Sequence, residues 1–335
     1  MTRAERKLDH IKHALSTGQS RATWLDDIRF VHQALPDSSW DKVSLQTQLG
    51  ELVFGSPFYI NAMTGGGGAR TTELNSQLAR ISREMNIPMA VGSQMAAIKN
   101  PEEIATFATV RKENPDGLIF ANLGSEASVD QAKRAVDMLE ANALQIHLNV
   151  IQELTMPEGD RDFSGALSRI EQLVNDLDIP VIVKETGFGI SREAAMKLQS
   201  INVAAIDIGG FGGTNFAAIE NERRHRKLSF FNDWGIPTAA ALIETTSLNS
   251  KVPVLASGGI QHALDMVKCL SLGASAVGLA GKVLKTLVEE GEQATIEEIK
   301  EINEDLTMLM VSLGANTIED LQKVPLIISG ELHHY

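Results

Sequence analysis

Four polar side chains gather where one short apolar segment of the sequence ends, in the stretch HLNVIQE at residues 147–153. If residues 143–149 form an extended strand, His147 and Asn149 point to the same face of it, because side chains alternate along a strand. Gln152 and Glu153 follow directly after that strand. A buried strand rarely places imidazole and carboxamide groups together on one face, so the stretch indicates a functional site at a strand end.

The elements that must position these residues repeat along the chain. Eight short segments rich in Val, Ile, Leu and Ala have the composition of buried parallel strands, and amphipathic helical patterns lie between most of them. The predicted strands are residues 57–63, 87–92, 117–123, 143–149, 180–185, 203–209, 252–258 and 274–280. Eight such units predict an α/β fold, a closed (β/α)8 TIM barrel. A doubly wound open sheet is the alternative, but no Gly-x-Gly-x-x-Gly follows the first predicted strand.

The barrel is expected to carry an N-terminal extension and C-terminal helices. Residues 1–50 precede the barrel, and the segments VSLQT and ELVF, joined at Gly50, predict a hairpin that caps its lower end. The connections at residues 150–165 and 210–236 are long, which is typical of loops that form lids on the upper face. No linker or repeat divides the chain, so a single domain over residues 1–335 is predicted.

Composition and charge exclude several classes of protein. With 43% hydrophobic and 22% charged residues the composition is that of a globular protein, and the net charge of -13 opposes non-specific binding to nucleic acid. The one cysteine, Cys269, excludes an intramolecular disulfide and a cysteine-rich metal site. The sequence has no apolar segment long enough for a membrane span and no signal-peptide pattern at its charged start, which predicts a cytoplasmic protein without membrane partners.

Small or polar residues follow every predicted strand, which is where the active sites of TIM barrels lie. After the last two strands come Gly258, Gly259 and Gly281, and a predicted helix follows each of the two glycine sites. Backbone N–H groups at helix starts bind phosphate, although glycine also serves tight turns. The pair of glycine sites on neighbouring strands favours a cofactor that carries a phosphate group.

Lys184 and the stretch MTGGGG at residues 63–68 add to this candidate site. Lys184 either extends into solvent or faces the barrel mouth and supports negative charge; alternation does not decide, but the polar ends of the other strands favour the mouth. Four consecutive glycines permit a close approach of the backbone to a flat ring, to which Thr64 offers a hydroxyl. The basic stretch ERRHRK at residues 222–227 is either a solvated surface or part of a closing lid.

The order of the motifs resembles that of the type 2 isopentenyl-diphosphate Δ-isomerases. The resemblance runs from the first ten residues to the tail: Arg6-Lys7 with His10, MTGGG at 63–67, GSQ at 92–94, HLNxxQE at 147–153, VKE at 183–185, GGFGGT at 209–214, DWGIPT at 233–238, SGGI at 257–260 and AG at 280–281. HLNxxQE together with the basic N-terminal turn is specific, whereas SGG and AG are shared with many flavin barrels.

The resemblance implies an enzyme of isoprenoid biosynthesis that interconverts isopentenyl diphosphate and dimethylallyl diphosphate. It implies reduced FMN and Mg2+ as cofactors, with NADPH as the flavin reductant. It implies that FMN contacts Ala62, Met63, Thr64, Ser93, Asn122, Lys184, Thr214, Gly258, Gly259, Ala280 and Gly281. The substrate would be bound by Arg6, Lys7, His10, His147, Asn149 and Gln152, and the magnesium by Glu153. Barrels of this flavin class often assemble symmetrically, so a homo-oligomer, a tetramer or an octamer, is expected.

A 1,3-shift of a double bond needs an acid and a base on opposite sides of a short hydrocarbon chain in a dry site. The family implies N5 of reduced flavin as the proton carrier. Gln152 and Lys184 are the catalytic candidates in the chain. Gln152 either transfers a proton or holds a water, and Lys184 is hypothesised to stabilise the anionic reduced ring.

Other barrels and a non-catalytic class are the alternatives. An α-hydroxy-acid oxidase carries a histidine beside the glycines at a strand end, and VAAIDIGGFGG has none. An inosine-monophosphate-dehydrogenase-like enzyme needs a loop cysteine and a glutamate-synthase-like enzyme a cysteine cluster, whereas Cys269 lies in a helical pattern. A flavin- or phosphate-binding protein without activity would not need Arg6, Lys7 and Glu153.

Overall fold

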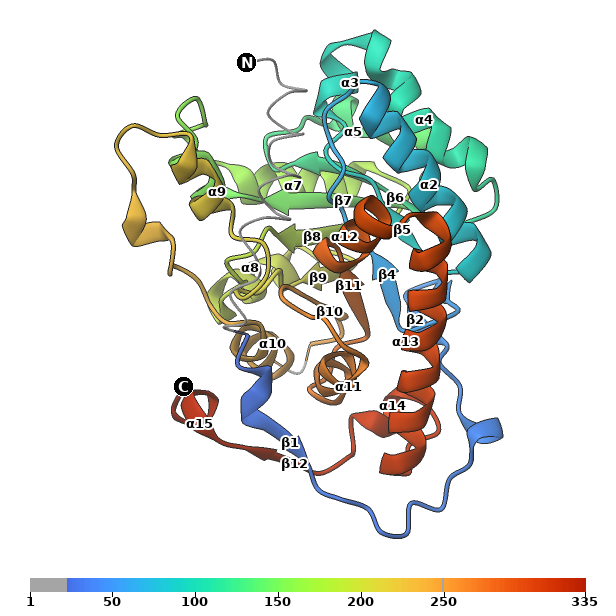
Figure 1. Ribbon diagram of the computed structural model, residues 1–335. Coiled ribbons are helices and arrows are strands. Elements are labelled where there is room, and N and C mark those ends of the chain that lie inside the picture. The colour runs from blue at the N-terminus through green and yellow to red at the C-terminus, as the bar shows by residue number, and fades with distance from the viewer. Residues whose placement is uncertain (1–22, 249) are drawn as a thin grey trace.

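A closed barrel of eight parallel strands forms the centre of the molecule (Figure 1). The computed structural model describes residues 23–248 and 250–335. The barrel strands are β4 (Phe58–Ile60), β5 (Met89–Ala90), β6 (Ile119–Gly124), β7 (Ala143–Leu148), β8 (Val181–Glu185), β9 (Ala205–Asp207), β10 (Val254–Ser257) and β11 (Ala276–Leu279). They follow around the barrel in sequence order, and β11 pairs with β4 to close it. The predicted TIM barrel is confirmed and the open-sheet alternative is wrong.

The register between neighbouring strands brings three side chains to one side of the barrel wall. His147 on β7 is opposite Lys184 on β8, and Lys184 is opposite Asp207 on β9. Residues that are paired across parallel strands share a face, because inward and outward positions alternate along every strand. All three side chains therefore belong to the same face of the sheet.

Helices surround the barrel and cover its outer face (Figure 1). The longer helices between strands are α2 (Ala69–Met85), α4 (Ile104–Glu113), α5 (Val129–Leu139), α7 (Ala166–Asp176), α8 (Arg192–Ser200), α10 (Thr238–Thr246), α11 (Ala263–Ser271) and α12 (Gly281–Glu290). The shorter ones are α3 (Met95–Lys99), α6 (Val150–Thr155) and α9 (Phe216–Glu222), with α13 (Glu292–Leu313), α14 (Ile318–Leu321) and α15 (Gly330–His334) at the C-terminal end. Across residues 23–248 and 250–335, no helix has the length and apolar character of a membrane span.

Local sequence signals explain where several of these helices begin and end. At the start of α5 the side chain of Ser128 accepts a hydrogen bond from the Gln131 N–H, and the Gln131 side chain accepts one from the Ser128 N–H. Helix α2 ends at Asn86, whose φ of 50° is left-handed. Single-turn 3-10 helices occupy connections: η1 (Leu25–Asp27), η2 (Trp40–Lys42), η3 (Pro101–Glu103) and η4 (Ser229–Phe231).

A hairpin closes the lower end of the barrel, as the sequence predicts. Its strands are β2 (Thr47–Leu49) and β3 (Leu52–Phe54), and Gly50 in the turn has a φ of 59°, which favours glycine. Pairing extends from the turn only as far as Thr47 opposite Phe54, so the first strand lies closer to the turn than the segment VSLQT suggests. The Phe54 ring is fully buried and packs against two aromatic rings of the barrel interior, Tyr59 and Phe120.

The first and last parts of the described chain meet in a sheet that the sequence did not predict. β1 (Ile28–Phe30) runs antiparallel to β12 (Leu326–Ile328). Beside it, the Lys268 ammonium on α11 donates a buried hydrogen bond to the carbonyl of Leu25 at 2.8 Å. Strands of three residues whose partner lies at the other end of the chain leave no local pattern to read.

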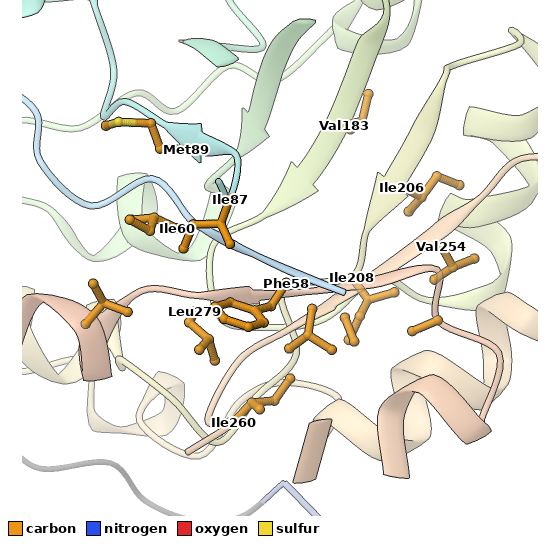
Figure 2. Close-up of a cluster of buried hydrophobic side chains, with 14 of the residues drawn as sticks. Phe58, Ile60, Ile87, Met89, Val183, Ile206, Ile208, Val254, Ile260 and Leu279 are labelled. Atoms are coloured by element: carbon orange, nitrogen blue, oxygen red, sulfur yellow. The ribbon is translucent and has the colours of Figure 1, made fainter. Parts of the chain in front are cut away.

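Apolar side chains form two large cores, one on each side of the barrel wall, and a small third cluster of Phe188, Phe211 and Ala217. Outward-facing strand residues such as Phe58, Ile60 and Val183 belong to the larger core, which extends to the surrounding helices (Figure 2). Each of the eight strands also gives one inward side chain to a smaller core: Tyr59, Ala90, Phe120, Ala143, Ile182, Ala205, Leu255 and Ala276. Leu49 and Phe54 of the hairpin complete this inner core. Because the barrel is filled below, a site can open only at the upper ends of the strands.

Candidate active site

A cavity of about 460 Å³ lies at the carboxyl ends of the barrel strands. All eight strand ends contribute to its wall, through Ala62, Ser93, Asn122, His147, Lys184, Gly209, Ser257 and Ala280. This is the face on which TIM barrels carry their active sites. The size and the few convergent polar groups suit a small-molecule ligand.

Most of the residues predicted to bind FMN line this cavity: Ala62, Met63, Ser93, Asn122, Lys184, Thr214, Gly258, Gly259, Ala280 and Gly281. His147, Asn149, Gln152 and Glu153 line it as well. Arg6, Lys7 and His10 lie outside the described residues. The structure thus brings residues from the whole length of the barrel into one wall, while the ligand contacts predicted for them stay predictions.

Thr64 is placed differently from the other predicted FMN residues. Its side chain is buried, and its hydroxyl donates to Oδ1 of Asn75 on α2 at 2.5 Å. Its carbonyl lies so close to Gly92 that a Cβ there would come within 2.0 Å of the oxygen. The predicted contact between the Thr64 hydroxyl and the flavin ring therefore competes with a hydrogen bond inside the protein.

The backbone after β10 and β11 fits the phosphate group of FMN. Gly258 and Gly259 have φ values of 107° and 69°, a region that favours glycine. A Cβ on Gly258 would lie 2.0 Å from the carbonyl oxygen of Gly210, so the chain packs too closely for a side chain. Gly281 is the first residue of α12, where the unpaired N–H groups and the helix dipole attract an anion. Two adjacent strand ends thus present glycine backbone to the same wall of the cavity.

Lys184 faces the cavity from the inward side of β8. Ile182, two residues earlier, lies in the inner core, so Lys184 also points into the barrel. Only 7% of Lys184 is exposed, and its ammonium donates to the carbonyl of Glu185 at 2.8 Å. The alternative of a lysine extended into solvent is wrong, and a buried ammonium in this wall can support negative charge on a bound molecule.

Glu185 is the buried last residue of β8, and burial raises its pKa to about 7. One of its oxygens, Oε2, accepts from the backbone N–H groups of Gly187, Phe188 and Gly189 at 2.7, 2.5 and 3.2 Å. These hydrogen bonds and the charge of Lys184 offset part of the rise. The carboxyl group therefore shapes the turn after β8, whose residues Thr186 and Gly187 line the cavity.

Three polar residues in the barrel interior were missed by the sequence analysis. Each lies two residues beyond a side chain of the inner core, and therefore points inward: Asn61 after Tyr59, Gln145 after Ala143 and Asp207 after Ala205. All three are buried. The signal that could have found them is the alternation of inward positions, which places a polar layer directly above the apolar one.

The fully buried Asp207 carboxylate accepts four hydrogen bonds. The donors are the Tyr59 hydroxyl at 2.7 Å, Asn61 Nδ2 at 2.8 Å, the Ser257 hydroxyl at 2.5 Å and the Gly209 N–H at 3.2 Å. A buried carboxylate is costly unless its oxygens are bonded, and these donors meet that need. Burial, with the charge and the hydrogen bond of Asp207, raises the pKa of Tyr59 well above its usual value, so the phenol remains a donor.

The stretch HLNVIQE enters the cavity from two elements. His147 lies on β7, whereas Asn149 is the N-cap of α6 and Gln152 and Glu153 lie in its first turns. The expectation that His147 and Asn149 share a face of one strand is therefore corrected: the strand ends at Leu148, and Asn149 has a ψ of 38°. The helical turn still brings Asn149 to the cavity wall.

Glu153 is held at the cavity by two hydrogen bonds. Asn149 Nδ2 donates to Oε1, and the Asp160 N–H donates to Oε2, both at 2.9 Å. Partial burial raises the pKa of the Glu153 carboxyl, and the nearby Asp160 and Glu126 carboxylates act in the same direction. Each oxygen keeps a lone pair for a cation, and a cation would relieve the repulsion among these carboxylates, so Glu153 fits a Mg2+ ligand.

Oxygens of a bound molecule or of water would complete the coordination of a cation at Glu153. Within the parts of the chain that the structure describes, no group of three His, Cys, Asp or Glu side chains is arranged to hold a metal ion. Mg2+ commonly binds through one or two carboxylates together with phosphate oxygens of a substrate. The Glu153 site is of that kind.

The basic stretch at residues 222–227 ties the loop after β9 to the loop after β7. Arg223 forms an ion pair with Glu158 at 2.7 Å. Arg224 donates to the carbonyl of Thr155 at 2.6 Å. The two arginines thus connect the two long loops that the sequence analysis expected to form a lid.

The family and its sequence relatives are clear from comparison with known proteins. A family model described as FMN-dependent dehydrogenase matches residues 129–327. An isopentenyl-diphosphate delta-isomerase of Geobacillus sp. (strain WCH70) is 56% identical over 335 residues, which covers 100% of this chain and 96% of the relative. One of Bacillus thuringiensis subsp. konkukian (strain 97-27) is 59% identical, with 100% and 96% covered.

Two solved structures illustrate the shared fold. A flavocytochrome b2 double mutant with pyruvate bound has a TM-score of 0.73 at 20% identity, covering 97% of this chain and 84% of that one. A mandelate oxidase mutant with the monooxide FMN adduct has a TM-score of 0.69 at 18% identity, with 95% of each chain covered. At these identities the likeness shows the barrel fold alone.

The raised pKa of Glu185 predicts a pH-dependent stability. The folded-state pKa of about 7 lies above the usual 4.5, so the folded protein favours the protonated carboxyl of Glu185. The resulting contribution to the free energy of unfolding is fully present below pH 4.5 and is lost as pH rises through 7. Glu185→Gln does not titrate, so its free energy of unfolding relative to wild type should rise by about 2 kcal/mol between about pH 5.5 and 8.5. Urea unfolding followed by circular dichroism measures this.

The matched control is Glu193→Gln, which changes an exposed carboxyl on α8. Its free energy of unfolding should follow that of wild type at both pH values. Equal pH dependence of Glu185→Gln and wild type would contradict the prediction.

Proposed function

Because the chain belongs to the isopentenyl-diphosphate delta-isomerase family, we propose that it interconverts isopentenyl diphosphate and dimethylallyl diphosphate with bound FMN. The observation that carries the proposal is the arrangement of the cavity. The glycine-lined end of β11 lies on the opposite side of the barrel from the end of β7, with its His147, Asn149 and Glu153. One side suits the phosphate of a cofactor, and the other suits the diphosphate of a substrate.

The residues proposed to hold FMN are those of the cavity wall together with Thr64. Gly258, Gly259 and Gly281 would bind its phosphate through backbone N–H groups, and Lys184 would support negative charge on its ring. Met63 and Ala62 leave β4 beside the ring site. Bound in its reduced form, FMN supplies a proton carrier for a reaction without net oxidation.

The diphosphate is proposed to bind at the end of β7. His147 and Asn149 would donate hydrogen bonds to its oxygens. Five carboxyl groups line the cavity, of Glu126, Glu153, Glu158, Asp160 and Glu185, against the two lysines Lys99 and Lys184. An anionic substrate would be repelled from such a wall unless a cation stood between, which supports Mg2+ bound by Glu153 and the diphosphate.

The hydrocarbon part of the substrate needs an apolar, dry place between an acid and a base. Met95, Met156 and Phe216 line the same cavity and can exclude water. Gln152, half-buried on α6, lies in that wall. A neutral carboxamide is a poor acid and base, so its proposed role is to orient the reacting end or a water beside it.

The N-terminal extension is proposed to complete the site within a single domain of residues 1–335. Arg6, Lys7 and His10 would add positive charge to a wall in which carboxyl groups outnumber the two lysines. NADPH is proposed to reduce the flavin, and the protein is proposed to act in the cytoplasm as a tetramer or an octamer.

Turnover of isopentenyl diphosphate tests the proposed function. Anaerobic protein with fully reduced FMN and Mg2+ should form dimethylallyl diphosphate, detected by proton NMR of the product. Oxidised FMN under the same conditions should give little product. A yellow protein that binds FMN without any turnover when reduced would favour the non-catalytic flavin-binding alternative.

Glu153→Gln should raise the Mg2+ concentration needed for half-maximal activity by about tenfold or more, because it removes the one carboxylate ligand. FMN should stay bound, as judged from its visible spectrum. Glu158→Gln is the matched control: Glu158 lines the same cavity but is paired with Arg223, so its Mg2+ requirement should stay near that of wild type. An unchanged Mg2+ requirement in Glu153→Gln would count against the metal site.

Lys184→Ala should lower the reduction potential of bound FMN by about 30 mV or more, because a charge that stabilises the reduced ring is lost. Reduced FMN should also bind more weakly, and turnover should fall. Lys99→Ala, which removes the other lysine of the cavity, should change the potential less. Normal potential, binding and turnover in Lys184→Ala would remove this role.

A further inference from the structure

Five polar side chains form a line of hydrogen bonds through the barrel interior. The line begins at Asp207 on β9, crosses to Asn61 after β4, crosses again to Gln145 on β7, and continues through Asn122 on β6 to His147 on β7. β4 and β7 are not neighbours in the barrel, so the middle of the line spans its interior. Asp207 and Gln145 are fully buried.

The carboxylate at the start gives the line a direction. A carboxylate only accepts hydrogen bonds, so Asn61 must turn its Nδ2 towards Asp207, at 2.8 Å. The Asn61 oxygen then points the other way. The Ala62 N–H donates to the same oxygen at 2.8 Å, which independently identifies it as the acceptor.

The side-chain amides of Gln145 and Asn122 continue the line with the same donor-to-acceptor direction. Gln145 donates from Nε2 to the Asn61 oxygen at 3.4 Å and accepts at Oε1 from Asn122 Nδ2 at 3.3 Å. Turning either amide round would bring N–H against N–H, or oxygen against oxygen, in a fully buried place. Unpaired buried polar groups are costly, so the orientation of one amide dictates that of the next.

At its end the line reaches the imidazole of His147. The Asn122 oxygen lies 2.9 Å from His147 Nδ1, and because that oxygen accepts, Nδ1 must carry a proton. We infer that Asp207 fixes His147 as the Nδ1–H tautomer through Asn61, Gln145 and Asn122. Asp207, which is not among the residues that line the cavity, is thus a positioning residue for the end of β7.

The tautomer decides which nitrogen a ligand meets. Nδ1 is committed to Asn122, so a molecule in the cavity that contacts His147 through a ring nitrogen does so through Nε2. The importance of this for diphosphate binding rests on the proposed function. The tautomer itself does not, because it follows from hydrogen bonds within the protein.

Nitrogen-15 NMR of the FMN-loaded full chain, with labelled histidine and no substrate, tests the inference. The spectra are recorded at a pH where the ring carries a single proton, and the shifts of its two nitrogens tell which one carries it. The His147 signals are those absent from His147→Gln. Wild type should be protonated on Nδ1. Gln145→Met breaks the line while keeping side-chain length, and should reduce the ratio of the Nδ1–H to the Nε2–H tautomer by about tenfold.

Tyr59→Phe is the matched control, because it removes another donor from the same Asp207 oxygen but leaves the line intact. Its tautomer ratio should equal that of wild type. If Gln145→Met does not bind FMN, Asn61→Ala interrupts the line one amide nearer to Asp207 and should give the same loss. A proton on Nε2 in wild type, or an unchanged ratio when the line is interrupted, overturns the inference. Isomerase activity plays no part in this test, so its failure and that of the proposed function are distinguishable.

Discussion

Fully buried inside the barrel, the Asp207 carboxylate takes its hydrogen-bond donors from strands on other sides of the wall. Tyr59 and Asn61 come from β4, Ser257 from β10 and Gly209 from the turn after its own strand. Because each carboxylate oxygen accepts two of these hydrogen bonds, the strand ends around the cavity are joined to one acceptor. The orientation of the amides in the wall, and so the pattern of donors and acceptors offered to a ligand, depends on this single anion.

Inside the barrel, the side chains of the apolar core lie below and the polar side chains of the candidate site lie above. The lower layer, with rings such as Phe54 and Phe120, is apolar and closed by the hairpin. Two residues further along the strands the layer is polar, and above it the backbone at Gly258 and Gly281 lies open to the cavity. Two residues that are two positions apart on a strand both point inward, one into the apolar core and the next into the polar layer. The alternation of side chains along the strand therefore determines both packing and ligand binding.

The fold could be predicted because eight apolar segments with helices between them have few other arrangements. Lys184 and the glycines after β10 could be predicted as site residues because strand ends converge in a barrel. Asp207 was not predicted as a site residue. Alternation along the segment VAAIDIG places its side chain inward, but does not reveal which donors from other strands it accepts hydrogen bonds from. The bond from Thr64 to Asn75 was equally invisible, because it depends on how α2 packs against the glycine-rich turn.

The pairing of β1 with β12 bears on how the chain is made on the ribosome. β1 leaves the exit tunnel long before its partner strand, Leu326–Ile328, because the whole barrel is synthesised between the two. The barrel likewise stays open until Ala276–Leu279 can pair with β4. Until then the edges of β4 and β1 have no partner and need protection from pairing with other chains. These two strand edges therefore stay exposed through most of the synthesis of the barrel, until β11 and β12 have been made.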